Sequence, residues 1–267
     1  MDKKKLSQIF IYPIKSLGGI PLLSSIAEER GLKYDRRWML IDENNSFITQ
    51  RQYPQMALLK VRIEGELLTV SKKNNEGEKI SLPLFSSSKK NLNVNIWDDT
   101  CTAELVSSVA DNWFSEILNV KCRLVRMPES TKRLVDRKYS SEEKSVSFAD
   151  GYPFLIIGQA SLDDLNKKLR QPLPIDRFRP NFVFTGGEPF EEDNWKKFKI
   201  GEVVFTALKP CARCMITTID QDSSEKGFEP LTTLASYRKK DSKVLFGMNL
   251  ICNSTGTINL ENEITFL

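Results

Sequence analysis

The chain has 267 residues, of which 40% are hydrophobic and 28% charged, close to an ordinary globular protein. Its net charge of +4 comes from scattered lysines and arginines, which argues against a nucleic-acid-binding protein. The apolar run near the start, residues 9–12, is too short for a signal-peptide core or a membrane span. We therefore expect a cytoplasmic protein that does not contact membranes.

The sequence contains no histidine, which excludes Ser-His-Asp and Cys-His catalysis and histidine-ligated zinc or haem. Proton chemistry must then use carboxylates, Lys, Tyr, Cys, a metal-bound group or water. The five cysteines are odd in number, and in a chain of this length they favour reduced thiols over a disulfide framework.

Short strands dominate the first half of the predicted structure. The expected strands are 8–12, 37–42, 47–50, 58–63, 67–70, 92–96, 101–105 and 122–125. Gly65 predicts one hairpin turn, and Asp98–Asp99 predicts another. The apolar residues of 107–118 fall on one helical face, so this segment is expected to be a helix capped by Ser107 or Ser108.

A polar and charged stretch, residues 128–147, predicts a long connection between two domains, residues 1–127 and 128–267. The strands expected after it are 154–157, 181–184, 203–208, 215–219, 244–252 and 257–267. One helix is expected over 161–169, with Ser161 and Asp164 as a capping box, and a short one over 230–238. The pattern predicts a β-dominated α+β protein with barrel-like closure, because closure removes exposed sheet edges.

The sharpest motif is KPCARCMITTID, residues 209–220, in which Cys211 and Cys214 form C-x-x-C. A structural zinc site would need two further ligands, and a thioredoxin-like dithiol would need a helix after the motif, where strand-like residues follow. Two inert cysteines, or one thiolate that binds a soft metal, also fit the spacing. Arg213 beside Cys214 favours a thiolate, but the spacing by itself leaves these alternatives open.

Basic residues stand beside several predicted strand ends. YPIKS places Lys15 and Ser16 after one strand, YDRRW places Arg36 before another, and RFRPN places Arg179 and Asn181 at a third. Strand ends of a barrel meet around its mouth, and converging Arg and Lys side chains suit a phosphate or another anion. Taken singly, each is also compatible with an ordinary surface charge.

The segments YPIKS, YDRRWMLID, ADGYPFLIIGQASLDDLN, RFRPNFVFTG and CARCMITTID occur in this order, and LFGMNLICNSTGTINLENEITFL closes the chain. This combination resembles the MOSC proteins that carry an N-terminal β-barrel domain. Within them it is most similar to the mitochondrial amidoxime-reducing component and its bacterial counterparts that reduce N-hydroxylated bases. The resemblance implies an N-terminal MOSC-type β-barrel domain and a C-terminal MOSC β-barrel with a few helices.

The resemblance also implies a molybdenum cofactor (Mo-molybdopterin) whose metal is bound by Cys214, the catalytic residue, and not by Cys211. The implied cofactor-binding residues are Lys15, Ser16, Arg36, Asp150, Gly151, Tyr152, Arg179, Asn181, Ala212, Arg213 and Asn249. Four of them depart from the mitochondrial pattern. Gly151 and Tyr152 replace small hydroxyl residues, Ala212 replaces a serine and Asn249 replaces a tyrosine.

The activity implied by the resemblance is molybdenum-dependent reduction of small N-hydroxylated substrates such as amidoximes and N-hydroxylated bases. The sequence shows no dinucleotide fingerprint and no iron–sulfur cysteine set, so electrons must come from a separate protein, a reductase with a ferredoxin- or cytochrome-type carrier. Two alternatives stay open: a cofactor-binding or carrier protein without turnover, and a thiol oxidoreductase that uses Cys211 and Cys214.

Overall fold

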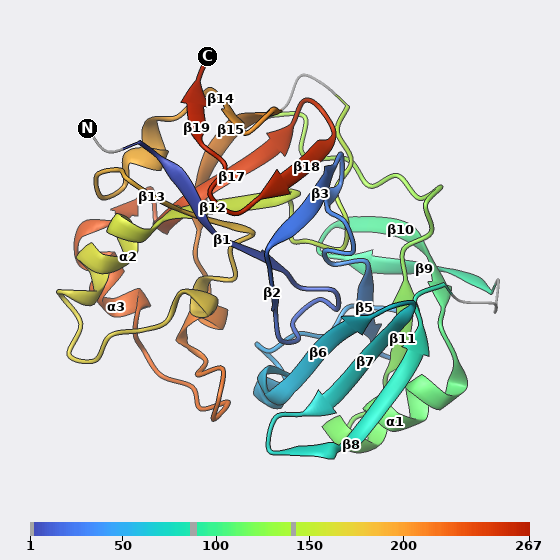
Figure 1. Cartoon of the computed structure of the whole chain (residues 1–267). Helices are drawn as coiled ribbons and strands as arrows, with labels where there is room; N and C mark the ends of the chain where they lie inside the picture. The colour runs from blue at the N-terminus through green and yellow to red at the C-terminus, as the bar shows by residue number, and fades with distance from the viewer. Residues whose placement is uncertain (1–2, 86–89, 140–142) are drawn as a thin grey trace.

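The computed structural model describes residues 3–85, 90–139 and 143–267 (Figure 1). Strands outnumber helices in these ranges, so the predicted β-dominated α+β class is confirmed. No helix in this part of the chain is both long and apolar enough to cross a membrane.

The largest sheet has nine strands, with β16 paired to β17 beside the path β19-β14-β15-β17-β12-β13-β1-β2. Its strands are β1 (Lys5–Ile11), β2 (Ile20–Leu22), β12 (Phe154–Gly158), β13 (Phe182–Thr185), β14 (Lys197–Ile200), β15 (Val203–Ala212), β16 (Lys239–Lys240), β17 (Lys243–Cys252) and β19 (Ile264–Phe266). Within it, β12 and β13 are parallel, and every other pair is antiparallel. All five residues of β12 are buried, which matches its uninterrupted apolar sequence.

Three smaller sheets complete the β structure. One sheet has the order β5 (Trp38–Ile41), β11 (Arg123–Arg126), β10 (Asp99–Leu105), β9 (Asn91–Ile96). The second has the order β6 (Leu59–Glu64), β7 (Leu67–Lys72), β8 (Asn75–Pro83). The third has the order β18 (Gly256–Asn259), β3 (Ser24–Glu28), β4 (Gly31–Leu32). Both predicted hairpins are confirmed, with Gly65 at a φ of +60° in the first. In the second, Ile96 pairs with Asp99, so Trp97 and Asp98 form the turn in place of Asp98–Asp99.

Three α-helices and four 3-10 helices lie in the described residues. They are α1 (Ser108–Leu118), α2 (Gln159–Asn166), α3 (Leu231–Tyr237), η1 (Pro54–Leu58), η2 (Ile175–Phe178), η3 (Glu191–Asn194) and η4 (Met215–Thr218). The Ser107 cap of α1 is confirmed by its hydrogen bond from the Ala110 amide, 3.1 Å long. The capping box at Ser161 is wrong. Ser161 lies inside α2, fully buried, because its hydroxyl donates to the buried carboxylate of Glu192 at 2.9 Å.

Two other local predictions are also wrong. Residues 215–219 form η4 where a strand was expected, because the Thr217 and Thr218 hydroxyls donate back to the carbonyls of Cys214 and Met215, at 3.0 and 2.8 Å. Residues 47–50 make only an isolated bridge at Phe47. In addition, β15 continues past Leu208 and Pro210 to Ala212.

The two halves of the chain interleave. Strand β1 pairs with β13 of the second half, and β3 pairs with β18 near the end of the chain (Figure 1). The buried amides of Gln50 and Gln221 donate to each other, at 3.2 and 3.1 Å, across 171 residues of sequence. A domain division at residue 127 therefore stays a prediction, and the first strands build the sheet of the second half.

Gly247 in β17 provides a test of this packing. Its φ is +79°, and a Cβ there would lie 2.7 Å from Ile157 Cγ1 and 3.0 Å from the Ile156 carbonyl oxygen. Gly247→Ala should combine backbone strain with overpacking and lower the free energy of unfolding by about 2–5 kcal/mol in urea denaturation. Gly65→Ala is the control, because its φ is +60° but no atom lies within 4 Å of the added carbon. Gly65→Ala should lower the free energy of unfolding by only about 1 kcal/mol. Equal losses in the two variants would mean that close packing around Gly247 does not contribute to stability.

Candidate functional site

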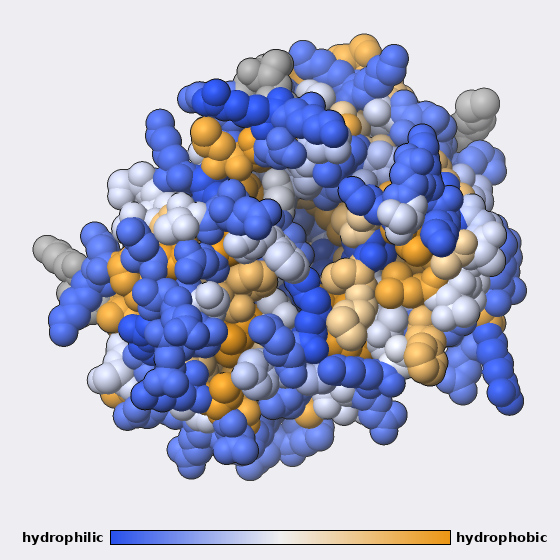
Figure 2. Space-filling view, turned by 180° about the vertical axis from the view of Figure 1, so that it is seen from behind, coloured by the Kyte–Doolittle hydropathy of each residue, from blue (hydrophilic) through white to orange (hydrophobic). Residues whose placement is uncertain are grey.

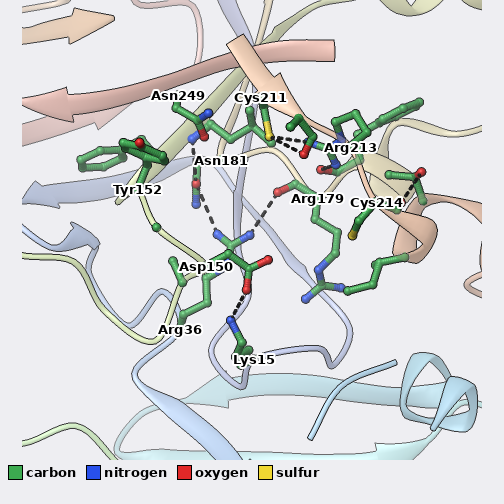
Figure 3. Close-up of a pocket in the computed structure, with 18 of the residues that line it drawn as sticks. Lys15, Arg36, Asp150, Tyr152, Arg179, Asn181, Cys211, Arg213, Cys214 and Asn249 are labelled. Carbon is green, nitrogen blue, oxygen red and sulfur yellow. Dashed lines mark hydrogen bonds and ion pairs between the residues drawn. The ribbon is translucent and has the colours of Figure 1, made fainter. Parts of the chain in front are cut away.

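A cavity of about 320 Å³ lies where strands of both halves meet. All twelve residues singled out in the sequence line it: Lys15, Ser16, Arg36, Asp150, Gly151, Tyr152, Arg179, Asn181, Ala212, Arg213, Cys214 and Asn249. Figure 3 shows ten of the lining residues approaching one another from well-separated segments. The space-filling view from behind is hollowed near its middle, with many hydrophilic residues around the hollow (Figure 2).

The lining is strongly cationic. Among the described residues it contains six basic side chains and one carboxylate, that of Asp150; the basic residues are Lys15, Arg36, Arg51, Arg179, Lys209 and Arg213. Such an excess of positive charge in a concave, partly desolvated site suits an anionic ligand.

Cys214 lies at the start of η4, and its side chain is exposed at the cavity. Cys211, on β15, is partly buried and also lines the cavity. The Arg213 guanidinium donates to Cys211 Sγ at 3.1 Å and to the Phe178 carbonyl at 2.6 Å. The structure therefore directs the Arg213 guanidinium to Cys211, and the expected thiolate at Cys214 stays a prediction. The strand expected after Cys214 argued against a thiol oxidoreductase, but the structure has the 3-10 helix η4 at this position.

Arg36 and Arg179 are stacked on one buried ring. Their guanidinium carbons lie 4.4 and 4.2 Å from the ring centre of Tyr12, which is 1% exposed. Stacking on an aromatic face keeps two like charges close together inside the protein. The Tyr12 hydroxyl has no hydrogen-bond partner among the described residues, so the ring and not the hydroxyl makes these contacts. Burial lowers the pKa of Arg179 to about 10, and the charge of Arg36 adds to this effect.

The orientation of Arg36 is determined by buried hydrogen bonds. It donates to the fully buried carboxylate of Asp35 at 2.6 Å, to Asn181 Oδ1 at 3.3 Å and to the Arg179 carbonyl at 3.1 Å. Asp35 also accepts the Tyr12 amide at 2.7 Å. The Asn181 amide group donates to the Phe10 carbonyl, so much of its hydrogen-bonding capacity positions neighbouring strands.

Three of the predicted binding residues have a left-handed backbone, with φ of 68° at Ser16, 49° at Arg36 and 55° at Arg179. This conformation is uncommon for residues other than glycine, and it persists where surrounding contacts enforce it. The Ser16 carbonyl accepts a hydrogen bond from Gln50 at 2.7 Å, and that of Arg179 accepts the one from Arg36. Such strain clusters at functional sites in proteins.

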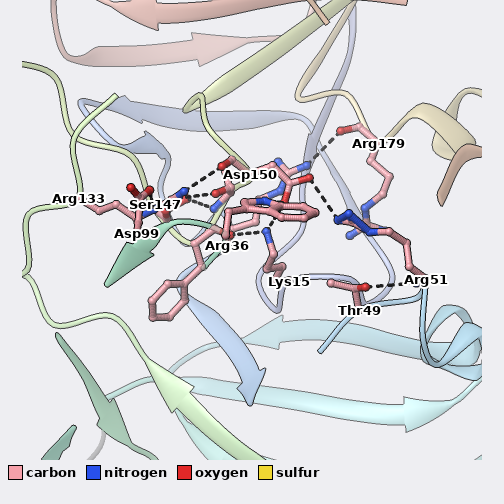
Figure 4. A network of polar contacts seen from close by, with 12 residues as sticks. Lys15, Arg36, Thr49, Arg51, Asp99, Arg133, Ser147, Asp150 and Arg179 are labelled. Carbon is pink, nitrogen blue, oxygen red and sulfur yellow. Dashed lines mark hydrogen bonds and ion pairs between the residues drawn. The ribbon is translucent and has the colours of Figure 1, made fainter. Parts of the chain in front are cut away.

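Lys15 and Asp150 form an ion pair at another part of the cavity (Figure 4). Burial lowers the pKa of Lys15 to about 8, although Asp150 opposes the change. Burial would raise the pKa of Asp150, but the charge and hydrogen bond of Lys15 outweigh it and hold that pKa well below its usual range. Buried Arg133 keeps this segment in place, with donor bonds to the carbonyls of Ser147, Ala149 and Asp150.

Two cationic lining residues were missed in the sequence, Arg51 and Lys209. Arg51 stacks on Trp97, with its guanidinium carbon 4.5 Å from the ring centre, and lies 3.7 Å from Asp150. Trp97 itself donates to Asp150 at 3.3 Å. A single arginine outside a recognisable motif gives no local signal, because only the fold brings it to the cavity.

Comparison with known proteins agrees with this architecture. The MOSC N-terminal beta barrel domain matches residues 3–121, and the MOSC domain matches residues 143–265. Mitochondrial amidoxime reducing component 2 of Rattus norvegicus is 31% identical over 282 residues, which cover 97% of this chain and 82% of the relative. The chain belongs to the MOSC family.

Other relatives of this MOSC protein include human mitochondrial amidoxime reducing component 2, 32% identical over 88% of this chain and 73% of the relative. Molybdenum cofactor sulfurase of Oryza sativa subsp. japonica is 35% identical over 97% of this chain. The chain spans only 33% of the length of that sulfurase. Both matched regions contribute to the cavity, Lys15 and Arg36 from the first and Asp150, Arg179 and Cys214 from the second.

The Tyr12 stack can be tested with sulfate as a probe of the cationic cavity. Tyr12→Leu removes the ring on which both arginines lie, so sulfate affinity should fall about tenfold, as expected for loss of about 1–2 kcal/mol of cation–π contact. Tyr12→Phe keeps the ring and should bind sulfate as the wild type does. Isothermal titration calorimetry measures the affinity and circular dichroism checks the fold. Equal affinities in the two variants would rule out a role for the ring.

The lowered pKa of Lys15 predicts that sulfate affinity depends on pH. Its pKa of about 8 means that the ammonium is charged below this pH and neutral above it. Sulfate keeps its charge across this range, so its affinity should fall as the pH rises from 6 through about 8 to 9. Lys15→Arg should flatten the profile, because arginine stays protonated there. A wild-type affinity that is constant over this range would contradict the shifted pKa.

Proposed function

We propose that this MOSC protein is a molybdenum-cofactor-dependent reductase of N-hydroxylated compounds, such as amidoximes and N-hydroxylated bases, in which Cys214 binds the metal. The observation that carries the proposal is the single cavity that joins an exposed cysteine thiol to six basic side chains. The relatives named as amidoxime reducing components support the substrate class, because they match nearly the whole chain.

The cavity fits the anionic end of a pterin cofactor. Arg36 and Arg179 offer guanidinium groups whose fork of donors suits a phosphate, and their positions are set before any ligand arrives. Arg51 adds a buried terminal nitrogen without a hydrogen-bond partner among the described residues. In the proposal, Lys15, Ser16, Arg36, Arg179 and Asn181 hold the phosphate and pterin, and the segments 150–152 and 212–213 with Asn249 complete the walls.

Cys214 fits the metal end. Thiolates are the protein ligands that suit soft redox metals, and the Cys214 thiol is exposed at the cavity with no neighbouring group occupying it in the described contacts. No group of three or more His, Cys, Asp or Glu side chains able to hold a metal ion occurs in the described ranges. When bound, the cofactor would supply the two-electron redox chemistry.

The reaction breaks the N–O bond of the substrate. Two electrons and two protons are consumed: one proton forms a new N–H bond on the nitrogen, and the other joins the hydroxyl group, which leaves as water. The protein binds and orients the substrate beside Cys214, while the electrons come from a separate carrier protein of the ferredoxin or cytochrome type with its reductase. In the proposal, the hydrogen-bonded arginines of the lining hold the cofactor in one geometry beside Cys214.

The two cysteines of the motif provide a matched pair of variants. Cys214→Ser should lose most of its molybdenum and all reduction of benzamidoxime by chemically reduced protein, because a hydroxyl is a poor ligand for a soft metal. Cys211→Ser should retain both, since its hydroxyl still accepts from Arg213. Elemental analysis of protein made in a molybdenum-competent host gives the metal content.

Equal metal loss in both variants would show that Cys214 is not the ligand. A fully loaded and chemically reduced wild type that turns over no N-hydroxylated compound would favour the non-catalytic cofactor carrier.

A further inference from the structure

Lys209 reaches the cavity because of an irregularity in β15. In its pairing with β17, Ala207 lies opposite Leu250 and Lys209 lies opposite Asn249, so Leu208 is an extra residue in the strand. Side chains alternate between the two faces of a strand, and one inserted residue reverses the alternation beyond it. Leu250 is in the core and Asn249 lines the cavity, so the bulge places Lys209 on the cavity face.

The ammonium of Lys209 lies between aromatic rings. Its nitrogen is 3.9 Å from the ring centre of Tyr139 and 4.9 Å from that of Tyr152, which itself lines the cavity. The two rings meet edge to face, with centres 6.3 Å apart. A lysine has four flexible side-chain bonds, and this contact with two rings restricts it to one side of the cavity.

Lys209 makes no ion pair or side-chain hydrogen bond to any residue that the structure describes. Asp136, on the same segment as Tyr139, accepts a hydrogen bond from the Lys138 amide instead. The other lysine of the cavity, Lys15, is paired with Asp150. Lys209 thus brings a charge to the lining that no described carboxylate neutralises, three residues before Ala212 and five before Cys214.

We propose that Lys209, held between Tyr139 and Tyr152, is a substrate-binding residue that selects N-hydroxylated compounds carrying a carboxylate. This inference rests on the proposed function, since it names the substrate class of the same cavity. An ammonium donates hydrogen bonds to a carboxylate, and the ring of Tyr152, which lines the cavity, can pack against a planar aromatic body attached to it. The shared chemistry is an anionic oxygen group, which a cofactor phosphate also carries, so the experiment separates the two sources.

The first measurement is binding of benzoate, by isothermal titration calorimetry, to protein purified from a molybdenum-competent host. Lys209→Met keeps the length of the side chain and removes its charge, and it should weaken benzoate binding about tenfold or more, with benzyl alcohol unaffected. Lys209→Arg should bind benzoate nearly as the wild type does. Lys33→Met is the matched control, because Lys33 is exposed and stacks on Tyr34 at 5.2 Å outside the cavity lining.

The second measurement compares 4-carboxybenzamidoxime with benzamidoxime in loaded, chemically reduced protein. Lys209→Met should lower kcat/KM about tenfold more for the carboxylated compound than for the neutral one. Benzoate binding that is identical in the wild type and Lys209→Met would overturn the inference, whether or not amidoximes are reduced. Loss of molybdenum and pterin from Lys209→Met would also overturn it, because the lysine would then serve the cofactor. Absence of all amidoxime turnover would refute the proposed function, and the benzoate titration would still decide the role of Lys209.

Discussion

Like charges held close together are the constraint on which this cavity depends. Two guanidinium groups on one buried ring repel each other, and burial disfavours their charged forms, as the lowered pKa of Arg179 shows. The fully buried carboxylate of Asp35 offsets part of this repulsion through its bond to Arg36. Backbone carbonyls accept further hydrogen bonds: the Leu17 carbonyl accepts one from the Arg179 side chain, and the Arg179 carbonyl accepts one from the Arg36 side chain. The result is a preorganised site, in which the cationic groups are already positioned to bind an anion.

This arrangement explains why the first strands belong to the sheet of the second half. Tyr12 follows β1, and β1 pairs with β13, which follows the left-handed turn at Arg179. The pairing of two strands far apart in sequence therefore sets the distance between the ring and the arginine that stacks on it. A separate N-terminal unit without this pairing would leave Arg179 without its aromatic partner.

The cavity also has unequal sides. Lys15 and Asp150 neutralise each other, Arg36 is paired with Asp35 and shares the Tyr12 ring with Arg179, and Arg213 is directed to Cys211. The Lys209 ammonium contacts two aromatic rings and forms no ion pair with any described residue. Charges that are held by fixed partners suit a permanently bound cofactor. An unpaired charge on a flexible side chain suits a substrate that binds and dissociates.

Local sequence determined the features that depend on neighbours in the chain. The apolar periodicity and serine cap of α1, the glycine at the β6–β7 turn and the uninterrupted burial of β12 all follow from short-range preferences. The twelve expected site residues were named from motifs, and the fold brings them to one cavity, although their roles stay proposals. Tertiary structure alone decided the rest. Long-range pairing set the bulge that turns Lys209 inward, the position of Arg51 and the ring beneath Arg36 and Arg179. Tertiary structure also decided that Arg213 contacts Cys211 and that η4 forms where a strand was expected. Strand register and side-chain direction depend on partners that are distant in the sequence, and not on adjacent residues.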